Sequence, residues 1–421
     1  MESVEDHRVK DMSLAGLGEK RILWSEKGMP VLLKIRDRFS REKPLSGLSI
    51  SACLHVTTET AALVKTLRAG GAEVALCGSN PLSTQDDVAA WLARAGFHVY
   101  AWKGESEKEY YECIDDVLSF NPSIVHDDGA DLIVRIHNKR PELTDKILGG
   151  LEETTTGVIR LKAMERDETL RVPVIAVNDT RTKRMFDNVF GTGQSTLDGV
   201  IRATGMLLAG KQIVICGYGY CGRGIAKRAD GMGAKVIVCE VDPVKALEAA
   251  MEGYRVMSLS KASEIGDIFI TATGCKDVVR KEHMAQMKDG AILANAGHFN
   301  VEISIPDLDE ISVEKRRIDH CVEEYRRSDG TRLYLLGEGR LVNLVCGVGH
   351  PPEVMDMSFA DQALCAEYLA KNKEKLNPRV YDVPEAIDLS VARLKLEAMG
   401  ITIDRLTDEQ LEYLKSWQLG V

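Results

Sequence analysis

Short apolar runs alternate with stretches of helical spacing along the first half of the chain. Runs rich in Val, Ile and Leu predict strands, whereas an apolar residue at every third or fourth position predicts a helix. We expect strands at 48–54, 73–77, 97–102, 123–126, 132–136 and 174–177, and helices at 59–69 and 86–95. This order predicts an α/β fold with a parallel sheet. A helical segment at 7–40 precedes it, with expected core contacts at Trp24, Met29, Leu32, Leu33 and Ile35.

The same alternation returns after a polar stretch at 178–192, which we interpret as a connector. A helix at 193–208 leads into strands at 211–216, 235–239, 268–271, 291–294 and 333–336, with helices at 223–232 and 244–251. Further helices are expected at 358–371, 390–399 and 408–417. The pattern predicts two doubly wound parallel-sheet domains, the second a Rossmann domain, and a small C-terminal helical segment.

One turn in the second half carries a G-x-G-x-x-G pattern, at Gly217, Gly219 and Gly222. It follows one expected strand and opens a helix, and the next strand ends in Glu240. This is the layout of a dinucleotide-binding βαβ unit, in which the helix N-terminus binds the pyrophosphate. An acid at the end of the second strand accepts hydrogen bonds from the ribose hydroxyls and repels a 2′-phosphate, which favours NAD over NADP.

Composition narrows the class of protein. A chain of 421 residues is too long for a single hydrophobic core, so more than one domain is expected. The formal charge of −10 argues against nucleic acid or an anionic membrane as a partner. No apolar run approaches a membrane span, and the N-terminus lacks the pattern of a signal peptide. The ten cysteines are scattered without a C-x-x-C pair, so we expect reduced thiols in the cytoplasm and no metal site.

Polar residues gather where the expected strands of the first domain end. His55 follows the first strand, and Asp127, Asp128 and Asp131 follow a later one. A histidine at such a place is more often a satisfied core residue than a catalyst. Three neighbouring acids usually form a solvated loop, although beyond a buried strand they could include a general base.

Three further groups leave the same choice open. Glu152 and Glu153 could belong to a helix cap or an exposed turn. Lys183 and Asp187 would share one face of a helix, where a surface ion pair is the ordinary interpretation. His298 follows a strand end of the dinucleotide domain, which faces the nicotinamide, and this position favours a functional role.

Taken together, these clusters occur in runs that match a known family. The matching runs are His55-Val56-Thr57-Thr58-Glu59-Thr60, Cys77-Gly78-Ser79-Asn80-Pro81-Leu82-Ser83-Thr84-Gln85-Asp86, Glu152-Glu153-Thr154-Thr155-Thr156-Gly157, Lys183-Arg184-Met185-Phe186-Asp187-Asn188, Gly297-His298-Phe299 and Glu338-Gly339-Arg340-Leu341-Val342-Asn343-Leu344. From about Trp24 to Leu414 the chain resembles S-adenosylhomocysteine hydrolase.

The resemblance implies a reversible, redox-neutral hydrolysis of S-adenosyl-L-homocysteine to adenosine and L-homocysteine. In that family, bound NAD⁺ oxidises the ribose 3′-hydroxyl to a ketone, which acidifies the C4′–H bond. A base then removes this proton and homocysteine leaves from C5′. Water adds to the resulting enone, and the ketone is reduced again.

By the same resemblance, six residues carry the chemistry. Lys183 would deprotonate the 3′-hydroxyl, which requires a lowered pKa, and Asp187 and Glu153 would hold it and bind the ribose. Asp128 would be the base at C4′, while His55 and His298 would serve the leaving group and the attacking water.

The resemblance also implies the binding residues. The substrate-binding residues would be Thr57, Glu59, Glu153, Lys183, Asp187 and His350. The cofactor-binding residues would be Thr154, Thr155, Thr156, Asn188, Gly217, Tyr218, Gly219, Gly222, Glu240, Asn295 and Asn343. Residues 1–188 with 349–390 would form the substrate-binding domain, 189–348 the NAD-binding domain, and 391–421 a C-terminal segment. The crossings at 188 and 348 would act as a hinge.

Two departures from the family pattern matter. Thr192 stands where many relatives carry a cysteine, so a thiol is not required there. The chain ends at Val421 without the Lys- and Tyr-bearing tail that reaches a neighbouring subunit's NAD site in longer members. We therefore expect a homotetramer that retains NAD less tightly.

Alternatives to this interpretation remain. The substrate could carry hypoxanthine instead of adenine, and Glu59, an acceptor-only group, favours adenine because adenine offers an N6 amino donor. A catalytically silent NAD-binding regulatory protein is a second alternative, against which the intact catalytic residues argue. A net-redox dehydrogenase is a third, and it would accumulate NADH.

Overall fold

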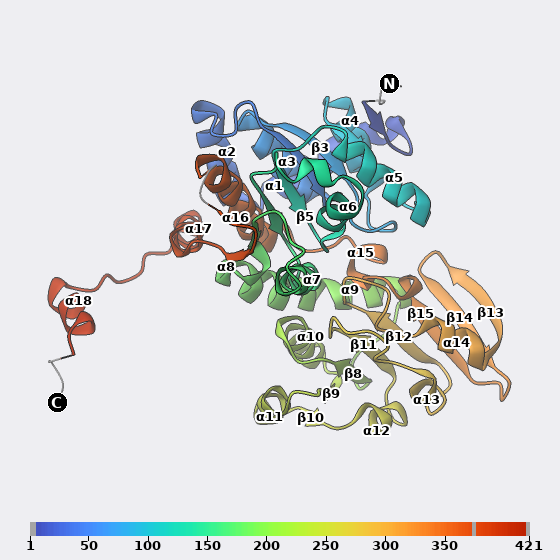
Figure 1. The fold of residues 1–421 in the computed structure, drawn as a ribbon. Helices are drawn as coiled ribbons and strands as arrows, with labels where there is room; N and C mark the ends of the chain where they lie inside the picture. Colours follow the sequence, from blue (N-terminus) through green and yellow to red (C-terminus); the bar gives the residue numbers. More distant parts are fainter. Residues whose placement is uncertain (1–5, 373–375, 418–421) are drawn as a thin grey trace.

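A computed structural model describes residues 6–372 and 376–417 of the chain. It contains two eight-stranded sheets, which occupy the upper and lower halves of Figure 1. Residues 418–421, the end of the C-terminal segment expected at 391–421, lie outside the described part. No helix within that part is long and apolar enough to cross a membrane.

The first sheet is entirely parallel, with the strand order β1-β4-β3-β2-β5-β6-β7-β16. Its strands are β1 (His7–Arg8), β2 (Ser49–Cys53), β3 (Glu73–Cys77), β4 (His98–Tyr100), β5 (Ile124–Asp127), β6 (Gly149–Glu152), β7 (Val174–Ala176) and β16 (Val380–Asp382). The helices packed with it are α1 (Ala15–Glu26), α2 (Pro30–Glu42), α3 (Thr58–Ala69), α4 (Asp86–Arg94), α5 (Glu107–Leu118), α6 (Asp131–Lys139), α7 (Thr155–Arg166), α16 (Pro352–Lys371) and α17 (Glu385–Ala398).

The second sheet has the order β10-β9-β8-β11-β12-β15-β14-β13, and all its pairings are parallel except the two that β14 makes with β15 and β13. Its strands are β8 (Gln212–Cys216), β9 (Lys235–Cys239), β10 (Arg255–Val256), β11 (Ile268–Thr271), β12 (Ala291–Asn295), β13 (Ser312–Asp319), β14 (Val322–Arg327) and β15 (Arg332–Leu336). Its helices are α10 (Tyr220–Gly231), α11 (Pro243–Met251), α12 (Leu259–Ser263), α13 (Lys281–Met284), α14 (Ile305–Ile311) and α15 (Val342–Val345).

The connection between the sheets is helical. It consists of α8 (Arg181–Lys183), the π-helical segment η4 (Arg184–Gly191) and α9 (Thr192–Thr204). The stretch 178–192, interpreted as a connector, does join the two sheets, and most of it is helical. Its apolar side chains Met185, Phe186 and Phe190 stay partly exposed, so the segment lacks the buried stripe by which helices are recognised.

Two expectations about the fold were wrong. Residues 132–136 belong to helix α6, because Leu132, Ile133 and Ile136 are buried at helical spacing while Arg135 faces outward in an ion pair with Asp115. Trp24 is 73% exposed and not a core contact, whereas Met29, Leu32 and Ile35 are buried as expected.

Some elements left no clear signal in the sequence. Strand β6 begins with Gly149 and Gly150, and it pairs with β5 and β7. A Cβ atom on Gly149 would lie 2.7 Å from the Leu369 side chain, so helix α16 packs too close for a larger residue. The charged strand β13 is almost wholly exposed, and it lacks the apolar alternation of a half-buried strand.

In each sheet there is one point at which the strand order reverses. The connections that follow the two neighbouring strands there lead to opposite sides of the sheet. In the first sheet this point lies between β2 and β5, and in the second between β8 and β11. Ligands of doubly wound sheets bind beyond the carboxyl ends of strands at such points. The topology therefore places His55 after β2, Asp128 after β5 and the glycine turn after β8 at the expected ligand positions.

Candidate active site

A cavity lies between the two sheets, at the carboxyl ends of their strands. Its lining residues are Leu54, His55, Thr57, Glu59, Thr60, Asp128, Glu153, Thr154, Lys183, Asp187, Asn188, Thr192, Cys221, Ala296, His298, Leu341, Asn343, Leu344, His350, Met355 and Phe359. All six residues expected to carry the chemistry are among them. They come from both halves of the molecule and from the connecting helices.

Lys183, Asp187 and Glu153 form one group, which we call the lysine cluster. The Lys183 Nζ atom lies 2.9 Å from Asp187 Oδ2 and 3.7 Å from Glu153 Oε1, and all three residues are buried. Lys183 also donates to Asn178 Oδ1 at 3.2 Å and to Asn188 Oδ1 at 2.9 Å. This pair is therefore not the surface ion pair that the sequence suggested by default.

The π-helical segment η4 explains part of this geometry. An i→i+5 helix widens the turn, and such segments often occur at functional sites. Lys183 reaches Asp187 and Asn188, which lie four and five residues later, at the same time. Asp187 is held in turn by a close contact of its Oδ1 atom with His350 Nδ1.

The expectation that Lys183 has a lowered pKa is contradicted. Burial lowers the pKa of Lys183, but the nearby charges of Asp187 and Glu153 outweigh it and raise the pKa above the ordinary value. Burial would raise the pKa of Asp187, yet His350 and Lys183 hold it well below the usual range. The reason is that the neighbours of Lys183 are carboxylates and amide oxygens, which favour the ammonium form.

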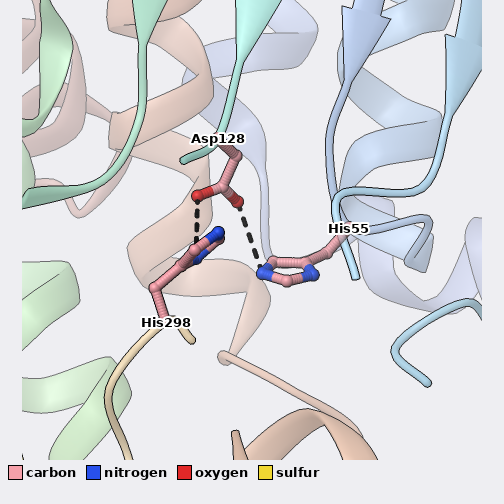
Figure 2. A group of neighbouring side chains, drawn as sticks. All are labelled: His55, Asp128 and His298. Atoms are coloured by element: carbon pink, nitrogen blue, oxygen red, sulfur yellow. Dashed lines mark ion pairs between the residues drawn. The ribbon is translucent and has the colours of Figure 1, made fainter. Parts of the chain in front are cut away.

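His55, Asp128 and His298 form a second group, the histidine cluster (Figure 2). His55 Nε2 lies 3.4 Å from Asp128 Oδ2, and His298 Nδ1 lies 3.6 Å from Asp128 Oδ1. Asp128 thus stands between a histidine of the first half and a histidine of the second. Both separations are longer than a normal hydrogen bond.

The three acids of 127–131 have different roles. Asp127 accepts hydrogen bonds from the backbone of Asp128 and Ile133, and burial raises its pKa to about 7. Asp131 pairs with Arg160 at 2.7 Å. Of these three acids, only Asp128 lines the cavity, so it is the one placed to act as a general base.

The glycine turn fits a dinucleotide. Gly217 has φ +97°, a backbone conformation that favours glycine. A Cβ atom on Gly222 would lie 1.9 Å from the Gly217 carbonyl oxygen. Gly219 is the N-cap of α10 and faces open space, where a pyrophosphate can approach the backbone. Glu240 accepts hydrogen bonds from the backbone N–H groups of Tyr218, at 2.7 Å, Val241 and Asp242.

The nicotinamide end also fits. Asn343 is buried, its Nδ2 atom donates to Ser195 Oγ, and its Oδ1 atom has no partner among the described residues. An unpaired buried acceptor suits a carboxamide N–H donor. Thr154 and Asn188 line the same cavity, and Thr155 and Thr156 follow at the start of α7.

Asn295 differs from the other expected cofactor residues. Its Oδ1 atom accepts from Thr271 and Gly297, and its Nδ2 atom donates to the carbonyl oxygens of Gly297, Phe299 and Gly339. Several of these hydrogen bonds hold the loop that carries His298. A positioning role in that loop suits these contacts better than direct binding of NAD.

Glu59, Met355 and Phe359 also line the cavity. Ser25 Oγ and Thr58 Oγ1 both donate to Glu59 Oε1, at 2.7 and 2.8 Å. Thr57 also lines the cavity, and its hydroxyl accepts from Thr60 N as the cap of α3. An apolar wall beside a fixed carboxylate suits a flat base with a hydrogen-bond donor at its edge.

The histidine cluster is the one group of described residues whose donor atoms could surround a metal ion, all lying within 4.8 Å of one another. The absence of a metal remains a prediction of the sequence. Ten reduced cysteines agree with the expected thiol state.

Several residues of the site gave no signal of their own in the sequence. Ser358 and Gln362 donate to the two oxygens of Glu153, and Asn178 receives a hydrogen bond from Lys183. Ser358 and Gln362 are fully buried in α16, the helix that also supplies Met355 and Phe359 to the cavity. Buried polar residues within an otherwise apolar helix are the signal that could have revealed them.

The sequence matches those of known proteins. A family model for S-adenosyl-L-homocysteine hydrolase matches residues 6–142, and one for the NAD-binding domain of that enzyme matches residues 188–349. The adenosylhomocysteinase of Sulfolobus acidocaldarius is 60% identical over 415 residues, which cover 99% of this chain and 100% of the relative.

Two other relatives are similar over the same length, and one of them is named for a different substrate. The S-inosyl-L-homocysteine hydrolase of Methanocaldococcus jannaschii is 58% identical over 98% of this chain and 100% of its own. The adenosylhomocysteinase of Aquifex aeolicus is 60% identical over 98% of this chain and 99% of its own. With these matches and a turn that fits its cofactor NAD, the chain belongs to the S-adenosylhomocysteine hydrolase family of enzymes.

Proposed function

We propose that the protein hydrolyses S-adenosyl-L-homocysteine reversibly to adenosine and L-homocysteine. The observation that carries this proposal is the meeting of the lysine cluster and the histidine cluster in one cavity beside the NAD turn. Oxidation at C3′ and elimination at C5′ require separate proton transfers at neighbouring carbons of one ribose. Two proton-transfer groups on one cavity suit that requirement.

Lys183 handles the proton of the 3′-hydroxyl, and Glu153 and Asp187 bind the ribose hydroxyls. When NAD is bound, it supplies the oxidation and later reduction of C3′. Because the carboxylates favour the ammonium form of Lys183, we infer that this residue must lose a proton before it can accept one from the 3′-hydroxyl. The contact between Asp187 and His350 holds the Asp187 carboxylate in place beside Lys183.

Asp128 removes the proton from C4′ once C3′ is a ketone. His55 and His298 flank it on both sides and serve the leaving sulfur and the attacking water. Burial between the two halves excludes bulk water from these groups. We place the substrate-binding domain at 1–188 with 349–390, the NAD-binding domain at 189–348 and the hinge at the crossings near 188 and 348.

Adenine is the base we propose, with Thr57 and Glu59 at its edge. Glu59 can only accept while ionised, and adenine presents an N6 amino donor. Hypoxanthine would place its O6 acceptor against the carboxylate unless the base shifted. The relative named for the inosine analogue makes S-inosyl-L-homocysteine the second candidate substrate.

We further propose a cytoplasmic homotetramer. Helix α18 (Asp408–Lys415) extends away from the body of the molecule in Figure 1. Leu411, Leu414 and Trp417 on this arm are 40%, 68% and 90% exposed. Apolar side chains on a projecting arm support burial against another copy of the chain.

Mass spectrometry of the products tests the function. The NAD-loaded enzyme is incubated with each homocysteine nucleoside, and we expect adenosine and homocysteine from S-adenosyl-L-homocysteine without net NADH. A kcat/KM at least tenfold higher for the inosine analogue would overturn the choice of base. No homocysteine from either nucleoside would overturn the function itself.

A further inference from the structure

The loop after β3 brings a buried hydroxyl to the back of His55. Ser83 is 2% exposed, and its Oγ atom lies 2.8 Å from His55 Nδ1. The same Oγ atom lies 3.1 Å from the carbonyl oxygen of Asn80. The backbone N–H of Ser83 donates to that carbonyl as well, at 3.2 Å, which fixes the loop as a turn.

Counting protons settles the direction of these contacts. A serine hydroxyl has one hydrogen, and a carbonyl oxygen can only accept. Both contacts are hydrogen bonds only if the Ser83 hydroxyl donates to Asn80 and accepts from His55. His55 therefore carries its hydrogen on Nδ1, because the bond made by one ring nitrogen decides the tautomer of a neutral imidazole.

The consequence appears on the other side of the ring. Nε2 of this tautomer has a lone pair and no hydrogen, and it faces Asp128 Oδ2 at 3.4 Å (Figure 2). An ionised carboxylate is also only an acceptor. The resting pair therefore holds two acceptors with no proton between them, which explains a separation longer than a hydrogen bond.

The charge state of His55 agrees with this arrangement. Burial is the largest influence on the ring and, despite the charge of Asp128, lowers its pKa to about 4. At neutral pH the ring is therefore neutral, and its tautomer decides what Nε2 can do. A cationic ring would carry hydrogens on both nitrogens and would make Ser83 irrelevant.

We propose that Ser83 is a positioning residue that keeps the lone pair of His55 on Nε2, so that His55 receives a proton from Asp128 before it donates one. This inference rests on the proposed function. It gives the hydroxyl of Ser83 a role in the elimination and hydration steps and none in the oxidation at C3′.

The protons balance along this path. The C4′–H bond breaks and its proton goes to Asp128, while its electron pair forms the C4′–C5′ double bond and the C5′–S bond breaks. Asp128 then passes the proton to His55 Nε2, which delivers it to the leaving thiolate. In the second half, Nε2 accepts a proton from water as oxygen bonds to C5′, and Asp128 returns it to C4′. No further reactant is needed.

The experiment compares Ser83→Ala with two controls in the NAD-loaded enzyme. Ser79→Ala removes a buried hydroxyl of the same loop that has no partner among the described residues. Ser83→Thr keeps the hydroxyl. For each protein, stopped-flow absorbance measures NADH formation after addition of S-adenosyl-L-homocysteine, and a thiol reagent measures release of homocysteine.

We expect Ser83→Ala to form NADH at the wild-type rate and to release thiol about tenfold more slowly at neutral pH, a part of the effect of losing the whole acid–base group. Ser79→Ala should match the wild type, and Ser83→Thr should recover most of the rate. The deficit of Ser83→Ala should persist down to pH 5, because a pKa of about 4 keeps the His55 ring neutral there and its tautomer still matters.

Thiol release by Ser83→Ala at the wild-type rate, or a deficit that vanishes by pH 5, would overturn the proposal while the wild type still hydrolyses its substrate. Failure of the wild type to release thiol would instead overturn the proposed function. Nitrogen-15 NMR of histidine-labelled wild-type protein gives an independent result if Ser83→Ala does not fold. A hydrogen on Nδ1 of His55 is expected, and one on Nε2 alone would contradict the proposal.

Discussion

The two proton-transfer groups of the cavity are built in opposite ways. In the lysine cluster, Lys183 has four partners, and two of them are carboxylates that keep it charged. In the histidine cluster, Asp128 stands 3.4 and 3.6 Å from two histidine nitrogens, and burial keeps His55 neutral. The lysine cluster holds its charged groups in fixed positions. In the histidine cluster, the carboxylate and the ring nitrogens are too far apart for hydrogen bonds, so a proton can be taken up there.

This difference suggests what each chemical step requires. Oxidation at C3′ depends on the exact placement of one hydroxyl, and a saturated network of hydrogen bonds provides placement. Elimination and hydration at C5′ move a proton in both directions, and a group with an open acceptor can take it up and return it. The account therefore predicts that damage to the two clusters stops the reaction at different steps.

Removing the charge of the lysine cluster should give the largest effect. In Lys183→Met we expect NAD to remain bound and NADH formation on addition of substrate to fall by roughly 10³-fold or more. The reason is that Lys183 is the one lysine among the described residues that line the cavity. Lys162→Met, which breaks a pair with Asp179 at the surface, is the matched control and should behave as the wild type. Normal single-turnover reduction in Lys183→Met would contradict the assignment.

A substitution behind the lysine cluster should have an intermediate effect. Gln362 donates to Glu153 Oε2 at 2.7 Å, and burial already raises the pKa of Glu153. Gln362→Leu removes a donor to the carboxylate, so we expect a further rise in that pKa and about a tenfold loss of kcat/KM at neutral pH.

Part of that loss should be recovered at higher pH, where Glu153 ionises again. The exposed Gln286→Leu controls for the change of residue type. An unchanged pH profile in Gln362→Leu would show that Gln362 acts through packing alone.

The smallest effect concerns stability in acid. Burial lowers the pKa of His126 to about 3 and that of His55 to about 4. Since the unfolded chain takes up these protons near pH 6.5, the free energy of unfolding should fall as pH drops from about 6.5 toward 4. His126→Leu should reduce this slope, because it removes one of the two histidines that take up a proton on unfolding. Denaturant titrations at several pH values measure the slope, and equal slopes would contradict the neutral state of His126.

Local patterns in the sequence predicted the parts of the fold that depend on local chemistry. Gly217, Gly219 and Gly222 are recognisable because a tight turn and a close helix require glycine at fixed spacing. Strand β3 was predicted at the residues where it occurs. Residues 132–136 were assigned to the wrong element, since a short apolar run has no clear period and only packing shows that Leu132, Ile133 and Ile136 share a helical face.

The site could be predicted only in part. The resemblance supplied residues that now line one cavity, but it did not supply their charge states. The pKa of Lys183 depends on Asp187 and Glu153, which approach it from different elements. Ser83 and Gln362 are ordinary polar residues in the sequence, and their contacts with His55 and Glu153 exist only after β2, β3, β6 and α16 have packed.

The most direct test of the division between the clusters is a double measurement on Asp128→Asn. The substitution removes the base at C4′ and leaves the lysine cluster untouched. After mixing the NAD-loaded variant with S-adenosyl-L-homocysteine, nicotinamide absorbance and free thiol are followed together. The account predicts NADH formation at the wild-type rate and thiol release at least about 10²-fold slower. Loss of NADH formation, or thiol release at the wild-type rate, would contradict it.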